Sequence, residues 1–236
     1  MQLFYNPDIK PNDEEVIFPK DESKHIVKVL RKTAGDVLDL TNGSGYFFKA
    51  EINHSSPSRC SAKILKSDYQ EPLPYNLHIA VAPTKLNDRY EWFLEKSTEI
   101  GITEITPLIC AHSERKVIKK ERYDRIIQSA MKQSLKAYLP QLNEAISFED
   151  FIEQSKKSTS EKYIAHCEET QRFSLKHELQ SKKNICILIG PEGDFSTSEI
   201  NLAIANNFKP VILGKSRLRT ETAAIIACHT TALHFD

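Results

Sequence analysis

The stretch NICILIGPEGDFSTSEINLAIANNFKPVILG, residues 184–214, predicts a strand, a helix and a second strand in succession. Apolar runs at 184–190 and 209–214 flank a segment with helical spacing. Ser196, with Glu199 three residues later, is the pattern of a capping box at the start of that helix. Because continuous apolar strands that alternate with helices are typical of a parallel sheet covered on both faces, the stretch indicates an α/β fold.

The same alternation runs through the chain from about residue 75. It predicts strands at 77–83, 104–110, 161–167, 184–190 and 209–214. It predicts helices at 89–101, 121–138, 196–208 and 220–233. Open α/β sheets bind ligands at the carboxyl ends of their strands, so we expect the functional site in the loops that follow these strands.

The first part of the chain has short alternating runs separated by turn signals. An Asn-Gly-Ser-Gly turn at 42–45 predicts a β-hairpin over residues 37–52. The other elements expected here are a strand at 58–69 and a short helix at 23–31 with Ile26, Val29 and Leu30 on one side. Several short strands with one helix predict a small β-barrel.

Between the two parts lies YQEPLPYN, residues 69–76, whose two prolines and polar flanks indicate a linker. We therefore predict two domains, a β-barrel at residues 1–70 and an α/β domain at residues 75–236. A chain of 236 residues has the length expected for two modest domains.

The composition excludes several classes of function. The chain carries 32 Lys and Arg against 32 Asp and Glu, so its net charge of zero gives no global reason to expect a nucleic-acid or membrane partner. The five cysteines form no C-x-x-C pair, so we expect no metal site. Cys110, Cys167 and Cys186 lie in apolar runs and are expected to be buried. No signal peptide and no membrane-spanning run is apparent, which favours a reduced, cytoplasmic protein.

The loop after the strand at 184–190 has an unusual composition for a ligand-binding turn. Turns that hold phosphates use backbone N–H groups and a basic side chain, but this turn carries Glu192 and Asp194. A neutral or cationic ligand would suit it better than a phosphate. The alternative is a tight connection in which Gly190 and Gly193 are needed for a positive φ.

The loop after the strand at 209–214 has the opposite charge. Lys215, Arg217 and Arg219 stand just before a helix that we expect Thr220 to cap. Cations are unfavourable at the N-terminus of a helix, so their presence points to an anionic partner such as a nucleic-acid phosphate or a carboxylate.

These two loops together, LIGPEGDFSTSEI and LGKSRLRTETAAIIA, resemble the signature of the RsmE family. The stretches HIVKVLRKTAGDVLDLTNGSGYFFKAEI, EWFLEKSTEIGITEITPLICAHSERK and KQSLKAYLP also resemble the family, in order along the chain. The resemblance implies an enzyme that methylates N3 of a uridine in small-subunit (16S) ribosomal RNA with S-adenosyl-L-methionine. It also implies a PUA-like barrel, a SPOUT-type domain with a C-terminal trefoil knot, and a homodimer.

The resemblance assigns site residues by their position in these motifs. The implied cofactor-binding residues are Ile189, Gly190, Gly193, Leu213, Gly214, Leu218 and Thr220. The implied catalytic residues are Arg219, which would stabilise the uridine anion, and Glu221 or Glu192, which would accept the proton. The residues expected to contact ribosomal RNA or the assembled small subunit are His25, Lys28, Arg31, Lys32, Arg115, Lys116 and Lys119. His166 and Cys167 end a strand beside this pocket, and we expect His166 to be a structural residue with its nitrogens hydrogen-bonded.

The chain departs from the family pattern at several positions. Asp194 and Ser216 stand where glycine and arginine are usual, Arg217 takes an apolar position, and Lys136 replaces an arginine. Two alternatives therefore stay open: a non-catalytic RNA-binding protein of ribosome assembly, and a SPOUT methyltransferase that acts on another RNA. A Rossmann-type oxidoreductase is disfavoured because no strand end carries G-x-G-x-x-G.

Overall fold

A computed structural model describes residues 2–180 and 183–236, which form two compact units. The first unit contains the described residues up to Pro72 together with Met131–Leu139. The second unit contains Leu73–Ala130 and Pro140–Asp236. Within the described parts of the chain, no helix is long and apolar enough to cross a membrane.

The first unit is built on a five-stranded sheet. In sheet order its strands are β1 (Leu3–Tyr5), β3 (Val37–Thr41), β4 (Tyr46–His54), β5 (Ser61–Tyr69) and β2 (Glu15–Ile17). β1 runs parallel to β3 and the other pairs are antiparallel. The sequence pattern predicts a small β-barrel here. In this described sheet the outer strands β1 and β2 do not pair with each other, so the sheet is a half-barrel.

The predicted hairpin is confirmed as the pair β3 and β4. Gly43 and Gly45 in its turn have φ of 71° and 99°, which is backbone that favours glycine. The Asn42 side chain accepts hydrogen bonds from the backbone N–H of Ser44 at 2.9 Å and of Tyr46 at 3.2 Å. The turn residues therefore act as the sequence pattern predicts.

The predicted helix at 23–31 consists of α1 (Lys20–Lys24) followed by a wider π-helical turn, η1 (His25–Val29). Ile26 is fully buried and Leu30 packs against the core, but Val29 is 64% exposed, so the prediction that all three lie on one side is wrong for Val29. A π-turn places more residues in each turn than an α-helix does, and this changes which positions share a face.

α3 (Lys120–Gln133) is shorter than the helix predicted at 121–138. The chain leaves it through Leu135, which has a left-handed φ of 55°. The residues that follow bond to the β3–β4 turn: Leu139 N–H donates to the Gly43 carbonyl and Gly45 N–H donates to the Ala137 carbonyl, both at 2.9 Å. Residues 131–139 therefore belong to the first unit, although the sequence pattern predicts one continuous helix.

The second unit contains an eight-stranded sheet in which every pairing is parallel, as predicted. Its main path is β11 (Phe173–Ser174), β13 (Lys209–Ile212), β10 (Glu161–Ala165), β12 (Asn184–Ile189), β6 (Asn76–Val81), β7 (Glu104–Ile109) and β8 (Gln141–Leu142). β9 (Ile146–Ser147) also pairs with β7. β12 lies between β10 and β6, and β13 lies on the other side of β10. The ends of β10, β12 and β13 are therefore next to one another.

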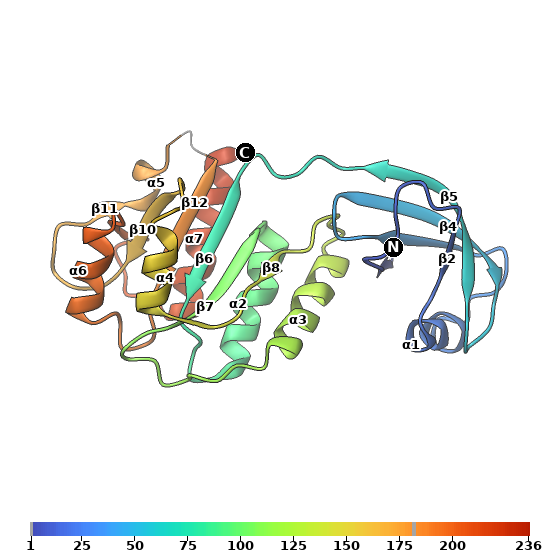
Figure 1. Ribbon diagram of the computed structural model, residues 1–236, viewed down its shortest axis with the longest axis horizontal. Helices are drawn as coiled ribbons and strands as arrows, with labels where there is room; N and C mark the ends of the chain where they lie inside the picture. The colour runs from blue at the N-terminus through green and yellow to red at the C-terminus, as the bar shows by residue number, and fades with distance from the viewer. Residues whose placement is uncertain (1, 181–182) are drawn as a thin grey trace. The chain divides into compact units, whose positions relative to one another are not determined.

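Helices cover both faces of this sheet (Figure 1). On one face lie α2 (Asn87–Ile100) and α7 (Thr220–Phe235), which pack against each other. On the other face lie α4 (Phe148–Ser155) and α6 (Thr197–Ala205), over a core that includes Phe148, Phe195 and Phe208. The capping box of Ser196 and Glu199 is present at the start of α6. α4, which the sequence pattern did not predict, and the four-residue α5 (Leu175–Glu178) complete this unit.

Candidate functional site

The loops that follow β10, β12 and β13 meet at one edge of the sheet. β10 lies between β12 and β13, and both pairings are parallel, so the three strands end on the same side. The loops are residues 166–172, 190–196 and 213–219. Because the carboxyl ends of neighbouring parallel strands are the usual ligand site of an open α/β sheet, this edge is the candidate site.

The glycines after β12 are explained by crowding. Neither Gly190 nor Gly193 has a positive φ, so the alternative that they are needed for left-handed backbone is wrong. A Cβ on Gly190 would lie 3.1 Å from ring atoms of Phe195. A Cβ on Gly193 would lie 3.2 Å from the Cβ of His112. A side chain at either position would force its neighbour to shift by a few tenths of an ångström, so close packing favours glycine at both.

Asp194 takes the left-handed position of the turn with φ of 64°. Aspartate is one of the few residues with a side chain that tolerates this backbone. Its carboxylate accepts hydrogen bonds from the backbone N–H of Cys167 at 2.6 Å and of Phe195 at 2.8 Å. Asp194 therefore keeps the turn and adds a bridge to the loop after β10.

Replacing Asp194 with alanine should lower the free energy of unfolding by about 2–4 kcal/mol, because two hydrogen bonds to a carboxylate are lost and alanine is strained at this φ. Asp194→Gly should cost less, because glycine adopts the backbone without strain. Urea unfolding of both variants measures the two contributions. Equal losses would contradict the role of left-handed backbone, and no loss in either would contradict the role of the bridge.

Thr220 joins the loops after β12 and β13. Its hydroxyl donates to the Gly190 carbonyl at 3.0 Å, and the residue is buried. The prediction that Thr220 caps α7 is wrong by one residue: the cap is Arg219, whose side chain makes no capping hydrogen bond. The Thr220 hydroxyl is used between loops, so the start of α7 is held against the turn after β12.

Two cavities lie between these loops and share lining residues. The larger, of about 630 Å³, is lined by the loops after β10 and β13 and includes Leu213, Gly214 and Leu218 of the implied cofactor set. The smaller, of about 290 Å³, includes Arg219 and Thr220 together with the acids Glu192 and Asp194. Cys167, Arg217 and Leu218 line both.

The implied cofactor residues of β12 and its turn do not line either cavity. Ile189 and Gly190 are buried behind the loop, and Gly193 packs against His112. Gly214 differs from them, because a Cβ built on it meets no atom within 4 Å. Gly214 also has no positive φ, so neither backbone conformation nor packing requires a glycine at this position. The missing side chain leaves space in the larger cavity.

His166 was expected to be a structural residue with satisfied nitrogens, and this is wrong. The residue is only 5% exposed, and neither ring nitrogen has a hydrogen-bond partner within residues 2–180 and 183–236. Burial lowers the pKa of His166, which favours the neutral ring. The Nε of Arg172 is also buried without a partner in the described chain. Both residues line the larger cavity, and no pattern in the sequence indicates a role for Arg172.

Cys167 is exposed, although its apolar neighbours predicted that it would be buried. β10 ends at Ala165, so Cys167 belongs to the loop and not to the strand. Cys60, Cys110, Cys186 and Cys228 are buried, and no disulfide joins any of the five cysteines. Within the residues that the structure describes, no group of three or more His, Cys, Asp or Glu is arranged to hold a metal ion.

The two acids considered as proton acceptors lie in different environments. Glu221 is buried in the first turn of α7, and its Oε1 is 3.9 Å from the Nε of Arg89. It lines neither of the two cavities between the loops. Glu192 is exposed, lines the smaller cavity beside Arg219, and accepts a hydrogen bond from the backbone N–H of Lys85 at 2.9 Å. Only Glu192 is therefore close to the candidate site.

The basic residues expected to contact RNA form two groups. His25, Lys28, Arg31 and Lys32 come from η1 and the turn after it in the first unit. Arg115, Lys116 and Lys119 lie between β7 and α3 in the second unit. The Arg115 guanidinium donates to the backbone carbonyls of Thr84 at 3.0 Å and Lys85 at 2.9 Å, so it holds a loop of the protein itself. Lys116 and Lys119 are exposed.

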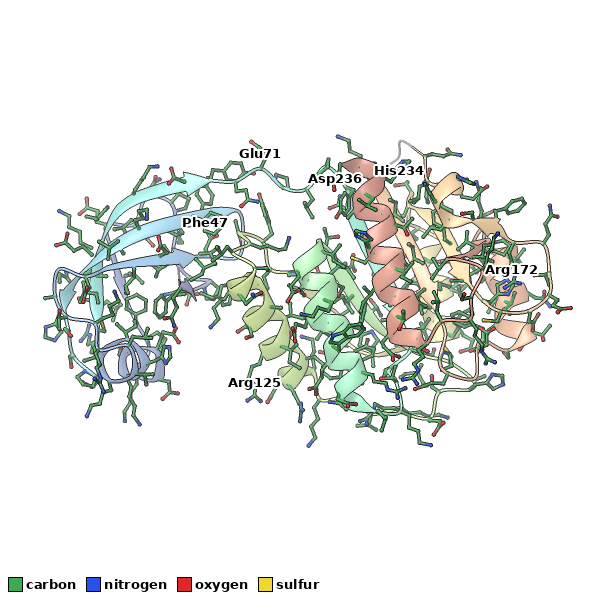
Figure 2. The ribbon with its side chains drawn as sticks, turned by 180° about the vertical axis from the view of Figure 1, so that it is seen from behind. Phe47, Glu71, Arg125, Arg172, His234 and Asp236 are labelled. Carbon is green, nitrogen blue, oxygen red and sulfur yellow. The ribbon has the colours of Figure 1, made fainter. Side chains whose placement is uncertain are left out.

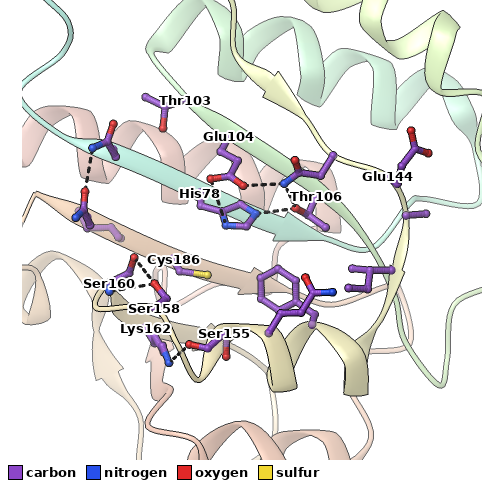
Figure 3. Close-up of a pocket in the computed structure, with 18 residues that line it drawn as sticks. His78, Thr103, Glu104, Thr106, Glu144, Ser155, Ser158, Ser160, Lys162 and Cys186 are labelled. Carbon is purple, nitrogen blue, oxygen red and sulfur yellow. Dashed lines mark hydrogen bonds and ion pairs between the residues drawn. The ribbon is translucent and has the colours of Figure 1, made fainter.

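A further cavity, of about 700 Å³, lies where β6, β7 and β12 begin, at the edge opposite the loops (Figure 3). His78 Nε2 lies 2.7 Å from Thr106 Oγ1, and the Asn143 amide donates to Glu104 at 2.7 Å. His78, Glu104, Thr106 and Asn143 pair with one another in this cavity. The ring nitrogens of His166 and the Nε of Arg172 have no partner in the described chain. The unpaired groups are the stronger indication of a ligand, so we place the site at the loop edge.

Comparison with known proteins identifies the family. Residues 71–232 match a family model described as an RNA methyltransferase domain, and residues 18–65 match one described as an RNA methyltransferase PUA domain. A ribosomal RNA small subunit methyltransferase E from Rickettsia conorii is 32% identical over 96% of this chain and 92% of its own length. The protein of that name from Bacillus subtilis is 28% identical over 88% of this chain and 85% of its own.

Solved structures agree with these matches. A probable rRNA-methyltransferase from Porphyromonas gingivalis has a TM-score of 0.90 and 42% identity, and the match covers 100% of this chain and 98% of the other. A ribosomal RNA small subunit methyltransferase E from Neisseria gonorrhoeae, bound to S-adenosyl methionine, has a TM-score of 0.85 and 29% identity over 99% and 97% of the two chains. The chain therefore belongs to the ribosomal RNA small subunit methyltransferase E family of RNA methyltransferases.

Proposed function

We propose that this protein transfers a methyl group from S-adenosylmethionine to N3 of a uridine in small-subunit ribosomal RNA. Family membership supports the class of reaction and of substrate. The observation that carries the assignment to this chain is the 630 Å³ cavity at the carboxyl ends of β10 and β13. Buried polar groups there lack partners within residues 2–180 and 183–236. The related Neisseria gonorrhoeae structure was solved with S-adenosyl methionine.

The residues around the two cavities fit this cofactor. S-adenosylmethionine supplies a methyl group on a positively charged sulfur, and it carries an amino group and a carboxylate. Glu192 and Asp194 give the smaller cavity a negative wall that suits the positive groups. Leu213 and Leu218 provide apolar surface, and Gly214 leaves room beside them. Ile189, Gly190 and Gly193 act in this proposal by shaping the turn behind the cavity.

Arg219 and Glu192 are placed to assist the reaction at N3. Removing the proton of a uridine N3 leaves a delocalised anion, and a guanidinium near its oxygens stabilises it. Arg219 lines the smaller cavity, and Glu192 lies on the same wall with a carboxylate that accepts protons. Glu221 is buried and paired with Arg89, so we propose that it positions the start of α7 and that Glu192 is the better candidate for the base.

We propose that the first domain, residues 1–70, binds RNA and that residues 75–236 carry out methyl transfer. The PUA model matches within the first range, and its candidate contacts are His25, Lys28, Arg31 and Lys32. In the second range Lys116 and Lys119 are the better candidates, because their side chains are exposed while the Arg115 guanidinium is bound to backbone. Contacts of this kind would be made to phosphates and would position the RNA without reading its sequence.

We also propose that the C-terminal chain forms the trefoil knot of SPOUT proteins. In its support, β12 enters the sheet between β10 and β6, and α7 returns to pack against β6 and β12. The Thr220 hydroxyl then ties the start of α7 to Gly190. A crystal structure with S-adenosylmethionine bound, traced through these loops, would test the knot and the pocket together.

A homodimer is expected in solution, with α2 and α7 contributing to the interface. These helices pack together and leave apolar side chains exposed, including Trp92 at 46% and Leu233 at 60%. Exposed large apolar side chains on neighbouring helices are typical of an interface. Light scattering at micromolar concentration should therefore give twice the mass of the 26.9 kDa chain. A monomer under these conditions would contradict the proposal.

Mapping of modified nucleotides tests the function and separates its alternatives. RNA from a strain that lacks the gene should have lost N3-methyluridine from the small subunit, and the intact gene should restore it. Persistence of this modification would show that another RNA is the substrate. A purified protein that binds RNA but shows no calorimetric signal with millimolar S-adenosylmethionine would support the non-catalytic alternative.

A further inference from the structure

The larger cavity has one wall whose polar groups the fold leaves unpaired. His166 follows the last residue of β10 and lines this wall. Arg172 lies in the segment between β10 and β11 (Figure 2). Both ring nitrogens of His166 and the Nε of Arg172 are buried without a hydrogen-bond partner in the described chain. Buried polar groups in folded proteins are nearly always paired, so a ligand that pairs with both is the simplest explanation.

The guanidinium of Arg172 is held beside His166. Its second nitrogen, Nη1, donates to the His166 carbonyl at 2.6 Å. This bond fixes the plane of the guanidinium and leaves the Nε–H as a further donor. Arginine has donors and no acceptor, and its planar donors match the geometry of a carboxylate or a phosphate. Of these two groups S-adenosylmethionine carries only the carboxylate.

The His166 ring complements this donor. Burial lowers the pKa of His166, and the charge of Arg172 lowers it further, although Asp194 acts in the opposite direction. A neutral imidazole offers one N–H donor and one acceptor nitrogen. Beside Arg172 its N–H would give a carboxylate a second donor without adding a second buried charge.

We propose that Arg172 and His166 bind the carboxylate of S-adenosylmethionine, an inference that rests on the proposed function. The cofactor has positive groups at the sulfur and the amine and one negative group, the carboxylate. The acids Glu192 and Asp194 line the smaller cavity, whereas Arg172 lines only the larger one. The acids share the smaller cavity with Arg217 and Arg219 and can face the sulfonium. Arg172 in the larger cavity faces the carboxylate, which is on the same carbon as the amine.

Two other cations line the larger cavity, Lys215 and Arg217, but their side chains are exposed. Water and salt weaken ion pairs at exposed positions much more than at buried ones. The Nε of Arg172 is out of contact with water and has no partner among the described residues. Arg172 is therefore the residue whose loss should most reduce recognition of a carboxylate.

Calorimetric titration with two ligands tests the proposal. One ligand is S-adenosylmethionine, and the other is its decarboxylated analogue, which keeps the sulfonium and the amine. The wild-type protein should bind S-adenosylmethionine roughly 10- to 150-fold more tightly, the ratio expected for a hydrogen bond to a charged group. Equal affinity of the wild type for both ligands would overturn the proposal without any variant. Binding of neither ligand would overturn the proposed function itself.

Variants locate the carboxylate. Arg172→Gln should remove most of this preference by weakening S-adenosylmethionine alone, and His166→Phe should remove part of it. Lys157→Gln, a change of an exposed cation outside both cavities, should leave the preference unchanged. Thermal unfolding checks that the variants are folded. If Arg217→Gln removes the preference and Arg172→Gln does not, the carboxylate lies against the loop after β13 and the proposal is wrong.

Discussion

A Gly214→Val variant should fold as the wild type does and bind S-adenosylmethionine about 5- to 150-fold more weakly. Gly214 lines the larger cavity, has no positive φ, and has no atom within 4 Å of the place where a Cβ would stand. The fold therefore accepts a side chain there, and the side chain occupies space that we assign to the cofactor. Forcing extra groups into a filled site costs roughly 1–3 kcal/mol, which gives this range of affinities.

Gly190→Ala is the matched control, because it changes a glycine on the other side of the same site. Its Cβ would stand 3.1 Å from the Phe195 ring, so we expect the free energy of unfolding to fall by about 1–3 kcal/mol. Thermal unfolding and calorimetric titration of both variants separate the two effects. Unchanged affinity in a folded Gly214→Val protein would show that the 630 Å³ cavity does not hold the cofactor.

Local patterns in the sequence were sufficient to predict the strands that form the site. Each strand lies in an apolar run of the sequence, and turn residues or a helical pattern follow each run. These strands are β6, β7, β10, β12 and β13. The loop residues Gly214, Leu218 and Arg219 could be selected because strand ends, charge and motif coincide there. The hydrophobic periodicity of a strand or helix reflects which of its own faces is buried. It can therefore be recognised in the sequence before the neighbouring elements are known.

The parts that were missed depend on contacts between distant residues. No local pattern indicates that β12 enters between β10 and β6, or that residues 131–139 bond to the β3–β4 turn. In the sequence Asp194 is only a departure from the pattern of the family that the chain resembles. Its role depends on the hydrogen bond that its carboxylate accepts from the Cys167 N–H, in a different loop. His166 is predicted to be structural because a lone histidine after a strand usually is. Only its surroundings show that its ring nitrogens have no partner among the residues that the structure describes.

An Arg219→Ala variant should lose about 10²- to 10³-fold in kcat while keeping its fold and its affinity for S-adenosylmethionine. This is the loss usually seen when one group that stabilises a developing anion is removed. The Arg219 side chain is exposed at the smaller cavity and makes no hydrogen bond or ion pair with any residue in 2–180 or 183–236. Its removal should change the free energy of unfolding by less than about 0.5 kcal/mol.

The absence of an internal partner for Arg219 in the described chain decides how the result is interpreted. A structural arginine would be paired, as Arg115 and Arg122 are, and its loss would lower stability together with activity. Lys157→Ala removes one exposed positive charge away from both cavities and should leave kcat unchanged, which controls for a general effect of charge on RNA binding. Arg219→Lys keeps the charge without the planar donors, and we expect it to recover only part of the activity.

Near-normal kcat in Arg219→Ala would remove Arg219 from the reaction. A rise in the KM for RNA with unchanged kcat would instead make it a substrate-binding residue, since only interactions specific to the transition state change kcat.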